Sequence, residues 1–279
     1  MDAERLIIDG GGALDAFVRA AAAAPKTAAL FCDIDGTISP IAPRPTDAEV
    51  PERFRDVLAA LVERLGLVAF VSGRAQDDAR RMIPMAGAAY VGNHGLETTL
   101  ADGTVEIEPQ AERYVPAIRE VAQSAARELD CEALGVVLED KRTVLAVHYR
   151  LAPDHAATRH AILARVVEPA RARGLAVATG HFAFEIRPPL PFSKGTAVKR
   201  LLGAGDYLTA LCCGDDLTDV TAFAAIRDWG ERDARRRACA VAAITGETPR
   251  PVLEAADVRV RATPGVYEAL ARLRAALGD

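Results

Sequence analysis

The sequence predicts an α/β protein with a parallel sheet at its core and a smaller α+β domain inserted into that core. Over roughly the first 100 residues, apolar runs typical of buried strands alternate with helical segments. The alternation resumes after residue 189, and between the two parts the order changes to helix, hairpin, helix, hairpin. We therefore assign residues 1–108 and 189–279 to the core and residues 109–188 to the inserted domain.

The core pattern begins with an alanine-rich helical segment, Leu14–Ala24, and an apolar strand, Ala28–Cys32. Apolar residues spaced three and four apart predict a helix over 52–65, and 67–71 reads as a second strand buried on both faces. Further strands are expected at 88–91, 207–213 and 238–244, with a last helix at 266–277. Repeated strand–loop–helix units imply a parallel sheet covered by helices on both faces.

The inserted domain should contain an antiparallel sheet, because its strands are joined by short turns. A helix is expected over 110–129, where Pro116 marks a break or a late start. The other elements are strands at 136–139 and 143–150, a helix at 153–173, and a second hairpin over 175–187. One face of each hairpin is apolar and the other carries both signs of charge, which fits either a solvated surface or a ligand-binding face.

Composition limits the possible functions. A net charge of −5 argues against a nucleic-acid partner, although local positive charge would still allow an anionic substrate. Apolar stretches of membrane-spanning length are missing from the sequence, so we expect no membrane partner. The five cysteines lack C-x-x-C spacing, and three of them, Cys32, Cys212 and Cys213, lie in apolar runs, which predicts a reduced, cytoplasmic protein. We expect a monomer, with a weak oligomer as the alternative.

The run Asp33-Ile34-Asp35-Gly36-Thr37 follows the first buried strand directly. Asp33 and Asp35 are two residues apart, so in an extended chain they point the same way. Like charges this close are unfavourable unless a cation or a proton separates them, and Mg²⁺ with a phosphate would satisfy the site. Gly36 permits a sharp turn and Thr37 supplies a hydroxyl. A plain turn followed by a helix cap is the alternative interpretation.

Polar residues also follow other strands or begin helices at the same predicted edge: Ser72, Lys194 and Asp215. Ligands of open parallel sheets bind at this edge. Asp33 can attack phosphorus, Mg²⁺ can bridge Asp33 and Asp215, and Lys194 and Ser72 can bind phosphoryl oxygens. Asp35 then remains as general acid and base. The constellation predicts phosphoryl transfer from an ester.

In order along the chain, Asp33-x-Asp35-Gly36-Thr37, Ser72, Lys194 and Gly214-Asp215-Asp216 resemble the four motifs of haloacid-dehalogenase-like phosphatases. The resemblance implies a Rossmann-like core and a nucleophilic Asp33 beside an acid/base Asp35. It also implies Mg²⁺ held by Asp33, the Asp35 backbone carbonyl and Asp215. The inserted segment looks like the α+β cap of sugar-phosphatase branches.

Further signatures are similar to those of the trehalose-6-phosphate phosphatase family: Ser72-Gly73-Arg74, Gly92–Glu97, His148-Tyr149-Arg150, Glu185–Pro188, Lys194-Gly195 and Gly214–Asp219. The resemblance implies that Glu139, Lys141 and Glu185 of the inserted domain bind the distal sugar. It places the remaining substrate contacts near the phosphate or the proximal sugar: Thr37, Gly73, Arg74, Asn93, His94, Arg150 and Arg187. Val220 and Thr221 stand where the family usually has acidic residues, which leaves the roles of Asp216 and Asp219 open.

The resulting prediction is a Mg²⁺-dependent hydrolase that converts trehalose 6-phosphate to trehalose and phosphate through an aspartyl phosphate. One alternative keeps the chemistry and changes the substrate to another disaccharide phosphate or a glycosyl-glycerate phosphate. Another alternative is a non-catalytic sensor of sugar phosphates. Such a sensor would be expected to lack Asp33, Asp35 or Lys194, and all three are present.

Overall fold

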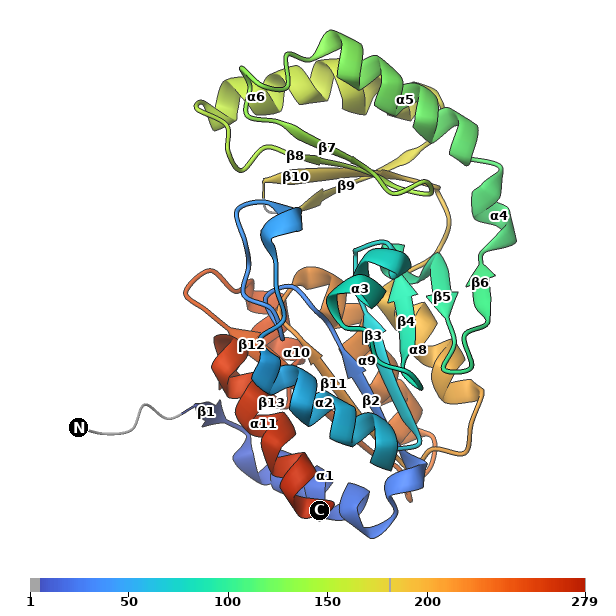
Figure 1. Ribbon diagram of the computed structural model, residues 1–279, viewed down its shortest axis with the longest axis vertical. Helices are drawn as coiled ribbons and strands as arrows, with labels where there is room; N and C mark the ends of the chain where they lie inside the picture. Colours follow the sequence, from blue (N-terminus) through green and yellow to red (C-terminus); the bar gives the residue numbers. More distant parts are fainter. Residues whose placement is uncertain (1–5, 181, 279) are drawn as a thin grey trace, which may run out of the picture. The chain divides into compact units, whose positions relative to one another are not determined.

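The computed structural model describes residues 6–180 and 182–278, so His181, in the turn of the second expected hairpin, lies outside the described residues. The chain forms two compact units (Figure 1). The core unit comprises Met1–Glu106 and Phe192–Asp279, and the inserted unit spans Ile107–Pro191, where the sequence predicts 109–188. The core unit is α/β and the inserted unit is α+β, which is the predicted fold class.

Within the described residues, the larger sheet has nine strands in the order β1-β13-β12-β11-β2-β3-β4-β5-β6. Its parallel centre consists of β2 (Ala28–Cys32), β3 (Leu67–Val71), β4 (Ala89–Gly92), β11 (Thr209–Gly214), β12 (Arg237–Ile244) and β13 (Val258–Arg261). The outer strands are β1 (Ile7–Asp9), β5 (Glu97–Thr99) and β6 (Val105–Ile107). β1 pairs antiparallel with β13, and β5 pairs antiparallel with β4. The parallel sheet expected from the sequence is therefore confirmed and carries antiparallel strands at its margins.

Helices cover both faces of this sheet (Figure 1). One face packs against α1 (Gly11–Ala23), α2 (Glu52–Arg64), α3 (Gln76–Met82) and α11 (Ala262–Ala276). The other face packs against α8 (Lys194–Gly203), α9 (Leu217–Glu231) and α10 (Arg250–Ala255). β2 shows why its sequence is apolar throughout: Leu30 and Cys32 enter the first core, while Ala29 and Phe31 enter the second.

Two features of the core unit differ from the sequence-based expectation. The last helix begins at Ala262, not at Val266, because Pro264 lies in its first turn, where backbone N–H groups have no acceptor within the helix. The outer strands β1, β5 and β6, and the parallel strand β13, were not predicted. They are short, and β13 alternates valine with arginine instead of forming an apolar run.

In the described part of the inserted unit, a four-stranded antiparallel sheet has the order β7-β8-β10-β9. Its strands are β7 (Val137–Asp140), β8 (Leu145–His148), β9 (Ala176–Gly180) and β10 (Ala183–Arg187). The first expected helix is broken into α4 (Pro109–Glu112) and α5 (Val115–Glu128), with Pro116 in the first turn of α5. α6 (His155–Ile162) continues through a π-helical turn (Leu163–Val167) into α7 (Glu168–Ala172). These helices cover one sheet face and enclose a separate core.

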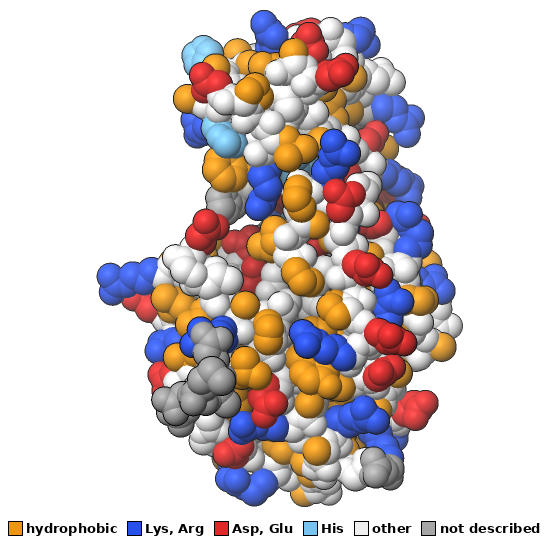
Figure 2. All heavy atoms as spheres, turned by 60° about the vertical axis from the view of Figure 1, so that its left-hand side comes forward, with side chains coloured by type: hydrophobic (Ala, Val, Ile, Leu, Met, Phe, Trp, Pro, Cys, Tyr) orange, Lys and Arg blue, Asp and Glu red, His pale blue; other side chains and the backbone are white. Residues whose placement is uncertain are grey.

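The surface carries interspersed charges, with Lys and Arg lying among Asp and Glu over the face shown in Figure 2. The basic run 235–237 is used locally: Arg235 pairs with Asp233, and the Arg236 guanidinium lies 4.7 Å from the centroid of the Trp229 ring. Arg236 also donates to the Trp229 carbonyl, so it fixes the turn after α9. Among the described helices, none has both the length and the apolarity needed to cross a membrane.

Candidate active site

Asp33 lies at the carboxyl end of β2, where its backbone N–H donates to the Cys213 carbonyl of β11 at 2.9 Å. The chain then turns sharply, because the Ile34 carbonyl accepts from the N–H groups of Ile38 and Ser39 at 2.9 and 2.8 Å. Gly36 is required in this turn: its φ is +80°, and a Cβ there would lie 2.0 Å from Asp215 Oδ2. The turn therefore brings the Asp33 motif against the Asp215 carboxylate.

Lys194 bridges two buried carboxylates at the start of α8. Its Nζ lies 2.8 Å from Asp33 Oδ1 and 2.7 Å from Asp219 Oδ1, and its side chain is 3% exposed. Ser193 caps the helix by accepting from the Thr196 N–H, which fixes where the lysine enters the site. The sequence prediction placed Lys194 at this edge, and the structure brings it into contact with Asp33.

Asp219 was left without a role by the sequence, and the structure places it at the centre of the site. Its Oδ1 contacts Lys194, while its Oδ2 accepts from the backbone N–H groups of Asp215 and Asp216, each at 3.1 Å. Asp216 is the N-cap of α9, so Asp219 is the third residue of that helix and reaches back to the end of β11. The capping-box spacing from Asp216 to Asp219 was the available signal for the hydrogen bonds between Asp219 and these backbone N–H groups.

The carboxylates of Asp33, Asp215 and Asp219 lie close enough that one oxygen from each falls within 4.8 Å of the others. Burial, followed by the charges of Asp219 and Asp215, raises the pKa of Asp33 well above its usual value, although Lys194 opposes the rise. Burial and the charge of Asp219 raise the pKa of Asp215 to about 7. Burial alone would lower the pKa of Lys194, but Asp219 and Asp33 outweigh it and raise that pKa. The site thus holds more negative charge than one lysine offsets.

This donor set suits a hard divalent cation. Carboxylate oxygens are the ligands that Mg²⁺ prefers, and a cation would offset the burial and the carboxylate repulsion that raise the pKa of Asp33 and of Asp215. Both oxygens of Asp219 already have partners, so Asp33 and Asp215 are the side chains best suited to a metal. Thr37, which is fully buried, donates its hydroxyl to Asp215 Oδ1 at 3.3 Å and helps to orient it.

The Ser72 and Arg74 side chains belong to the loop that follows β3. The Ser72 N–H donates to the Val91 carbonyl at 2.9 Å, and its hydroxyl oxygen accepts from the Arg74 N–H at 3.2 Å. The Arg74 guanidinium reaches Asp35 through two hydrogen bonds of 2.7 Å each and Asp78 through a third, also 2.7 Å. The resemblance placed Arg74 near the phosphate or the proximal sugar, and its contacts here are with a predicted catalytic carboxylate.

Asn93 and His94 lie in the loop after β4, in left-handed backbone conformations with φ of 47° and 56°. Backbone bonds tie this loop to the preceding one: the Asn93 N–H donates to the Arg74 carbonyl at 2.8 Å, and the His94 N–H donates to the Ser72 carbonyl at 3.1 Å. A Cβ on Gly73 would lie 2.7 Å from the His94 ring, which explains the glycine. The Asn93 amide donates to buried Glu97 at 3.0 Å.

In the inserted unit, the predicted sugar-binding residues share the polar face of the sheet. Glu139 of β7 and Glu185 of β10 both pair in register with Ala146 of β8, so the two carboxylates flank a small side chain on one face. Lys141 Nζ lies 3.6 Å from Glu139 Oε2, and the His148 ring nitrogen lies 3.2 Å from the same oxygen. Arg187 ends β10 and Arg150 follows β8; both are partly buried.

Comparisons with known proteins show which family this chain resembles. The family model described as trehalose-phosphatase matches residues 31–246. A trehalose-phosphate phosphatase of Mycobacterium leprae is 34% identical over 208 residues, which cover 71% of this chain and 48% of that protein. A protein of Mycobacterium tuberculosis described as an uncharacterized glycosyl hydrolase is 35% identical over 209 residues, covering 72% of this chain and 15% of its own length. The chain thus spans half or less of these curated relatives.

Solved structures show the same fold. A trehalose-6-phosphate phosphatase related protein superposes with a TM-score of 0.74 at 22% identity, covering 88% of this chain and 97% of that one. The C-terminal domain of the C. albicans trehalose-6-phosphate phosphatase superposes with a TM-score of 0.76 at 19% identity, covering 99% of each chain. With the family match over residues 31–246, these findings show that the chain belongs to the trehalose-phosphatase family.

Proposed function

We propose that this chain hydrolyses trehalose 6-phosphate to trehalose and phosphate through a covalent aspartyl phosphate. The observation that carries the proposal is the buried Lys194, which bridges Asp33 and Asp219 next to Asp215 at the carboxyl edge of the sheet. A carboxylate nucleophile, a fixed positive charge and spare acidic ligands in one buried site are what phosphoryl transfer requires. The relatives named trehalose-phosphate phosphatase support the choice of reaction.

In the first step a carboxylate oxygen of Asp33 attacks phosphorus, and the bond from phosphorus to the sugar oxygen breaks. Asp35 gives its proton to the departing oxygen, so neutral trehalose leaves. In the second step water attacks phosphorus, Asp35 accepts a proton from that water, and phosphate leaves with Asp33 restored. Lys194 and the Ser72 hydroxyl bind the phosphoryl oxygens and offset the charge that develops on them.

Mg²⁺ is the cofactor we propose, held by Asp33, Asp215 and the backbone carbonyl of Asp35. When bound, it supplies positive charge to the phosphoryl group and permits Asp33 to stay ionised beside the other carboxylates. The elevated pKa values of Asp33 and Asp215 support this assignment, because burial first and then the neighbouring carboxylates disfavour their ionised forms, which a bound cation would favour.

Specificity for the sugar is assigned to the inserted unit, in the role of a cap domain. Glu139, Lys141 and Glu185 offer paired acceptors and a donor to the distal sugar hydroxyls, and a polyol that fails to satisfy them leaves buried polar groups unpaired. Arg150 and Arg187, with Asn93 and His94 of the core unit, are proposed for the phosphate or the proximal sugar. The cytoplasmic location and the monomeric state stay predictions.

The decisive experiment is a phosphate-release assay on a panel of sugar phosphates, with and without Mg²⁺. We expect Mg²⁺-dependent turnover that is fastest with trehalose 6-phosphate. Much faster turnover of sucrose phosphate or a glycosyl-glycerate phosphate would change the substrate and keep the chemistry. Asp33→Asn should abolish turnover while substrate binding, measured by calorimetry, remains detectable. Binding without turnover by the wild-type protein would instead indicate a sensor.

A further inference from the structure

Arg74 connects Asp35 to a residue that the proposed mechanism does not use, Asp78 of α3. One edge of the guanidinium, Nε and Nη2, donates to both oxygens of Asp35. Nη1 donates to Asp78 Oδ2, four residues along the chain. The other oxygen of Asp78 accepts from Arg81 at 2.6 Å. Arg74 therefore holds the Asp35 carboxylate in one orientation, and Asp78 in turn holds the Arg74 guanidinium.

Burial makes this arrangement stiff. The Arg74 side chain is only 8% exposed, whereas those of Asp35 and Asp78 are 37% and 24% exposed. Burial would lower the pKa of Arg74, but its hydrogen bonds and charge interactions with Asp35 and Asp78 outweigh this and raise it. A guanidinium that binds both oxygens of a carboxylate fixes the plane of that group as well as its position. Asp35 keeps enough exposure to meet a ligand.

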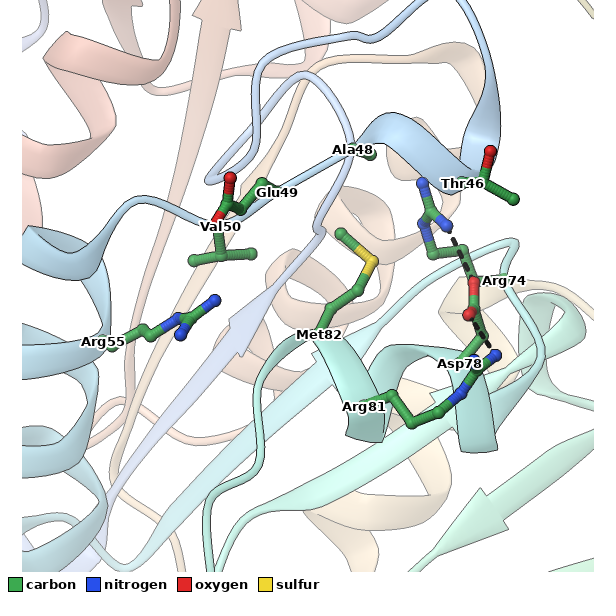
Figure 3. Close-up of a pocket in the computed structure, with 9 residues that line it drawn as sticks. All are labelled: Thr46, Ala48, Glu49, Val50, Arg55, Arg74, Asp78, Arg81 and Met82. Carbon is green, nitrogen blue, oxygen red and sulfur yellow. Dashed lines mark hydrogen bonds and ion pairs between the residues drawn. The ribbon is translucent and has the colours of Figure 1, made fainter.

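A pocket of about 370 Å³ borders Arg74 (Figure 3). Arg74 and Asp78 form part of its wall, together with Arg55, Arg81 and Met82. Because Arg74 borders this open space, its hydrogen bond to Asp78 adds to the packing that confines the guanidinium. Asp78, anchored on the regular helix α3, supplies the contact that holds Arg74 toward Asp35.

We propose that Asp78 is a positioning residue, which acts through Arg74 to hold the Asp35 carboxylate where it meets the leaving oxygen; the inference rests on the proposed function. Asp78 contacts neither Asp33 nor the acidic cluster in the described structure, so it acts on the reaction only through Arg74. In this proposal Arg74 mainly supports the acid/base carboxylate of Asp35. The family resemblance had instead implied that Arg74 contacts the substrate.

The test compares two phosphate esters that differ in their need for a proton. Trehalose departs as a poor leaving group that requires protonation, whereas the nitrophenolate of 4-nitrophenyl phosphate departs without it. We expect Asp78→Ala to lower kcat/KM about 10-fold for trehalose 6-phosphate, through kcat and with little change in KM, because small misplacements of a catalytic group are costly. For 4-nitrophenyl phosphate, kcat/KM should change less than about twofold.

Two further variants separate positioning from loss of structure. Asp78→Glu keeps an acceptor for Arg74 and should recover most of the lost activity. Glu254→Ala is the matched control, because Glu254 is the acidic partner of another arginine four residues away, Arg250, outside the site. This control should leave kcat/KM unchanged for both esters. The thermal midpoint of unfolding, measured for each variant, checks folding.

Each outcome bears on a different claim. Equal loss of kcat/KM with both esters, or a loss for trehalose 6-phosphate expressed in KM, would overturn the inference, because Arg74 would then hold the phosphate or the sugar. Full activity in Asp78→Ala would overturn it as well. A folded wild-type protein that turns over no sugar phosphate would overturn the proposed function and the inference with it. Loss confined to trehalose 6-phosphate and to kcat supports both.

Discussion

Without a bound metal, the stability of this protein should fall as the pH rises from about 4 to about 7, and Asp215→Asn should remove much of that fall. Burial and the charge of Asp219 raise the pKa of Asp215 from 3.8 to about 7 in the folded protein. The folded state therefore keeps a proton that the unfolded chain has already released at intermediate pH. Stability from this group is complete below about pH 4 and is lost as the pH rises through the folded pKa.

The size of the effect follows from the shift. A change of about three pKa units corresponds to about 4 kcal/mol, because each unit is worth about 1.4 kcal/mol. Part of Asp215 contacts solvent, which lowers the figure, so we expect between about 2 and 4 kcal/mol. Asp33 adds to the trend, since its own pKa is raised by burial and by the charges of Asp219 and Asp215.

The assay is urea unfolding in the presence of a chelator at pH 4, 5.5, 7 and 8, with wild type and Asp215→Asn measured in parallel. The difference between the two free energies of unfolding cancels titrations elsewhere in the chain. The wild type should lose stability relative to the variant as the pH rises, and excess Mg²⁺ should suppress the loss, because bound metal stabilises the ionised form. Parallel curves for the two proteins without metal would refute the reasoning.

Three other changes test the geometry of the site. Lys194→Met should lower the free energy of unfolding by about 3–5 kcal/mol, because it leaves buried carboxylates without their cation, and a much smaller change would contradict the buried bridge. Gly36→Ala should lower the free energy of unfolding by at least about 1–3 kcal/mol and remove most activity, because φ is positive there and the new Cβ would overlap Asp215. Retained activity would show that the turn can relax. Glu97→Ala should lower the free energy of unfolding by about 1–3 kcal/mol, because it removes the acceptor of the Asn93 amide. Glu97→Gln keeps an acceptor and should lower it less, and denaturant titration of both variants measures the difference.

The sequence predicted the parallel core because buried strands such as β2 and β3 are apolar at every position. It placed Asp33, Ser72, Lys194 and Asp215 at one edge, since residues that follow parallel strands meet there, and the structure joins Asp33 to Lys194 directly. Their catalytic roles stay proposals that the assays above test. The short strands β1, β5, β6 and β13 escaped prediction because none of them is a continuous apolar run. For β1 the pairing partner, β13, is also distant in sequence.

The partners of polar side chains were harder to predict than their positions. The family resemblance implied that Arg74 contacts the substrate, yet the direction of its side chain depends on where the Asp33–Thr37 turn places Asp35, 39 residues away. The sequence left the role of Asp219 open. Its contact with Lys194 arises only when α8 and α9 pack together, as Gly195 shows: a Cβ there would lie 2.3 Å from the Thr221 carbonyl oxygen. Such contacts depend on tertiary packing, and spacing along the chain does not encode them.

The register between β2 and β11 explains why the buried charges can meet at all. Cys32 pairs with Cys213, so Asp33, which follows β2, lies beside Gly214, which ends β11. At Gly214 a Cβ would lie 2.3 Å from the Asp219 carboxyl carbon, so the absence of a side chain there makes the space in which Asp219 receives Lys194. A shift of one residue in this pairing would separate Asp33 from that space. The apolar strands thus do more than build the core, because their alignment sets the distance between nucleophile and cation.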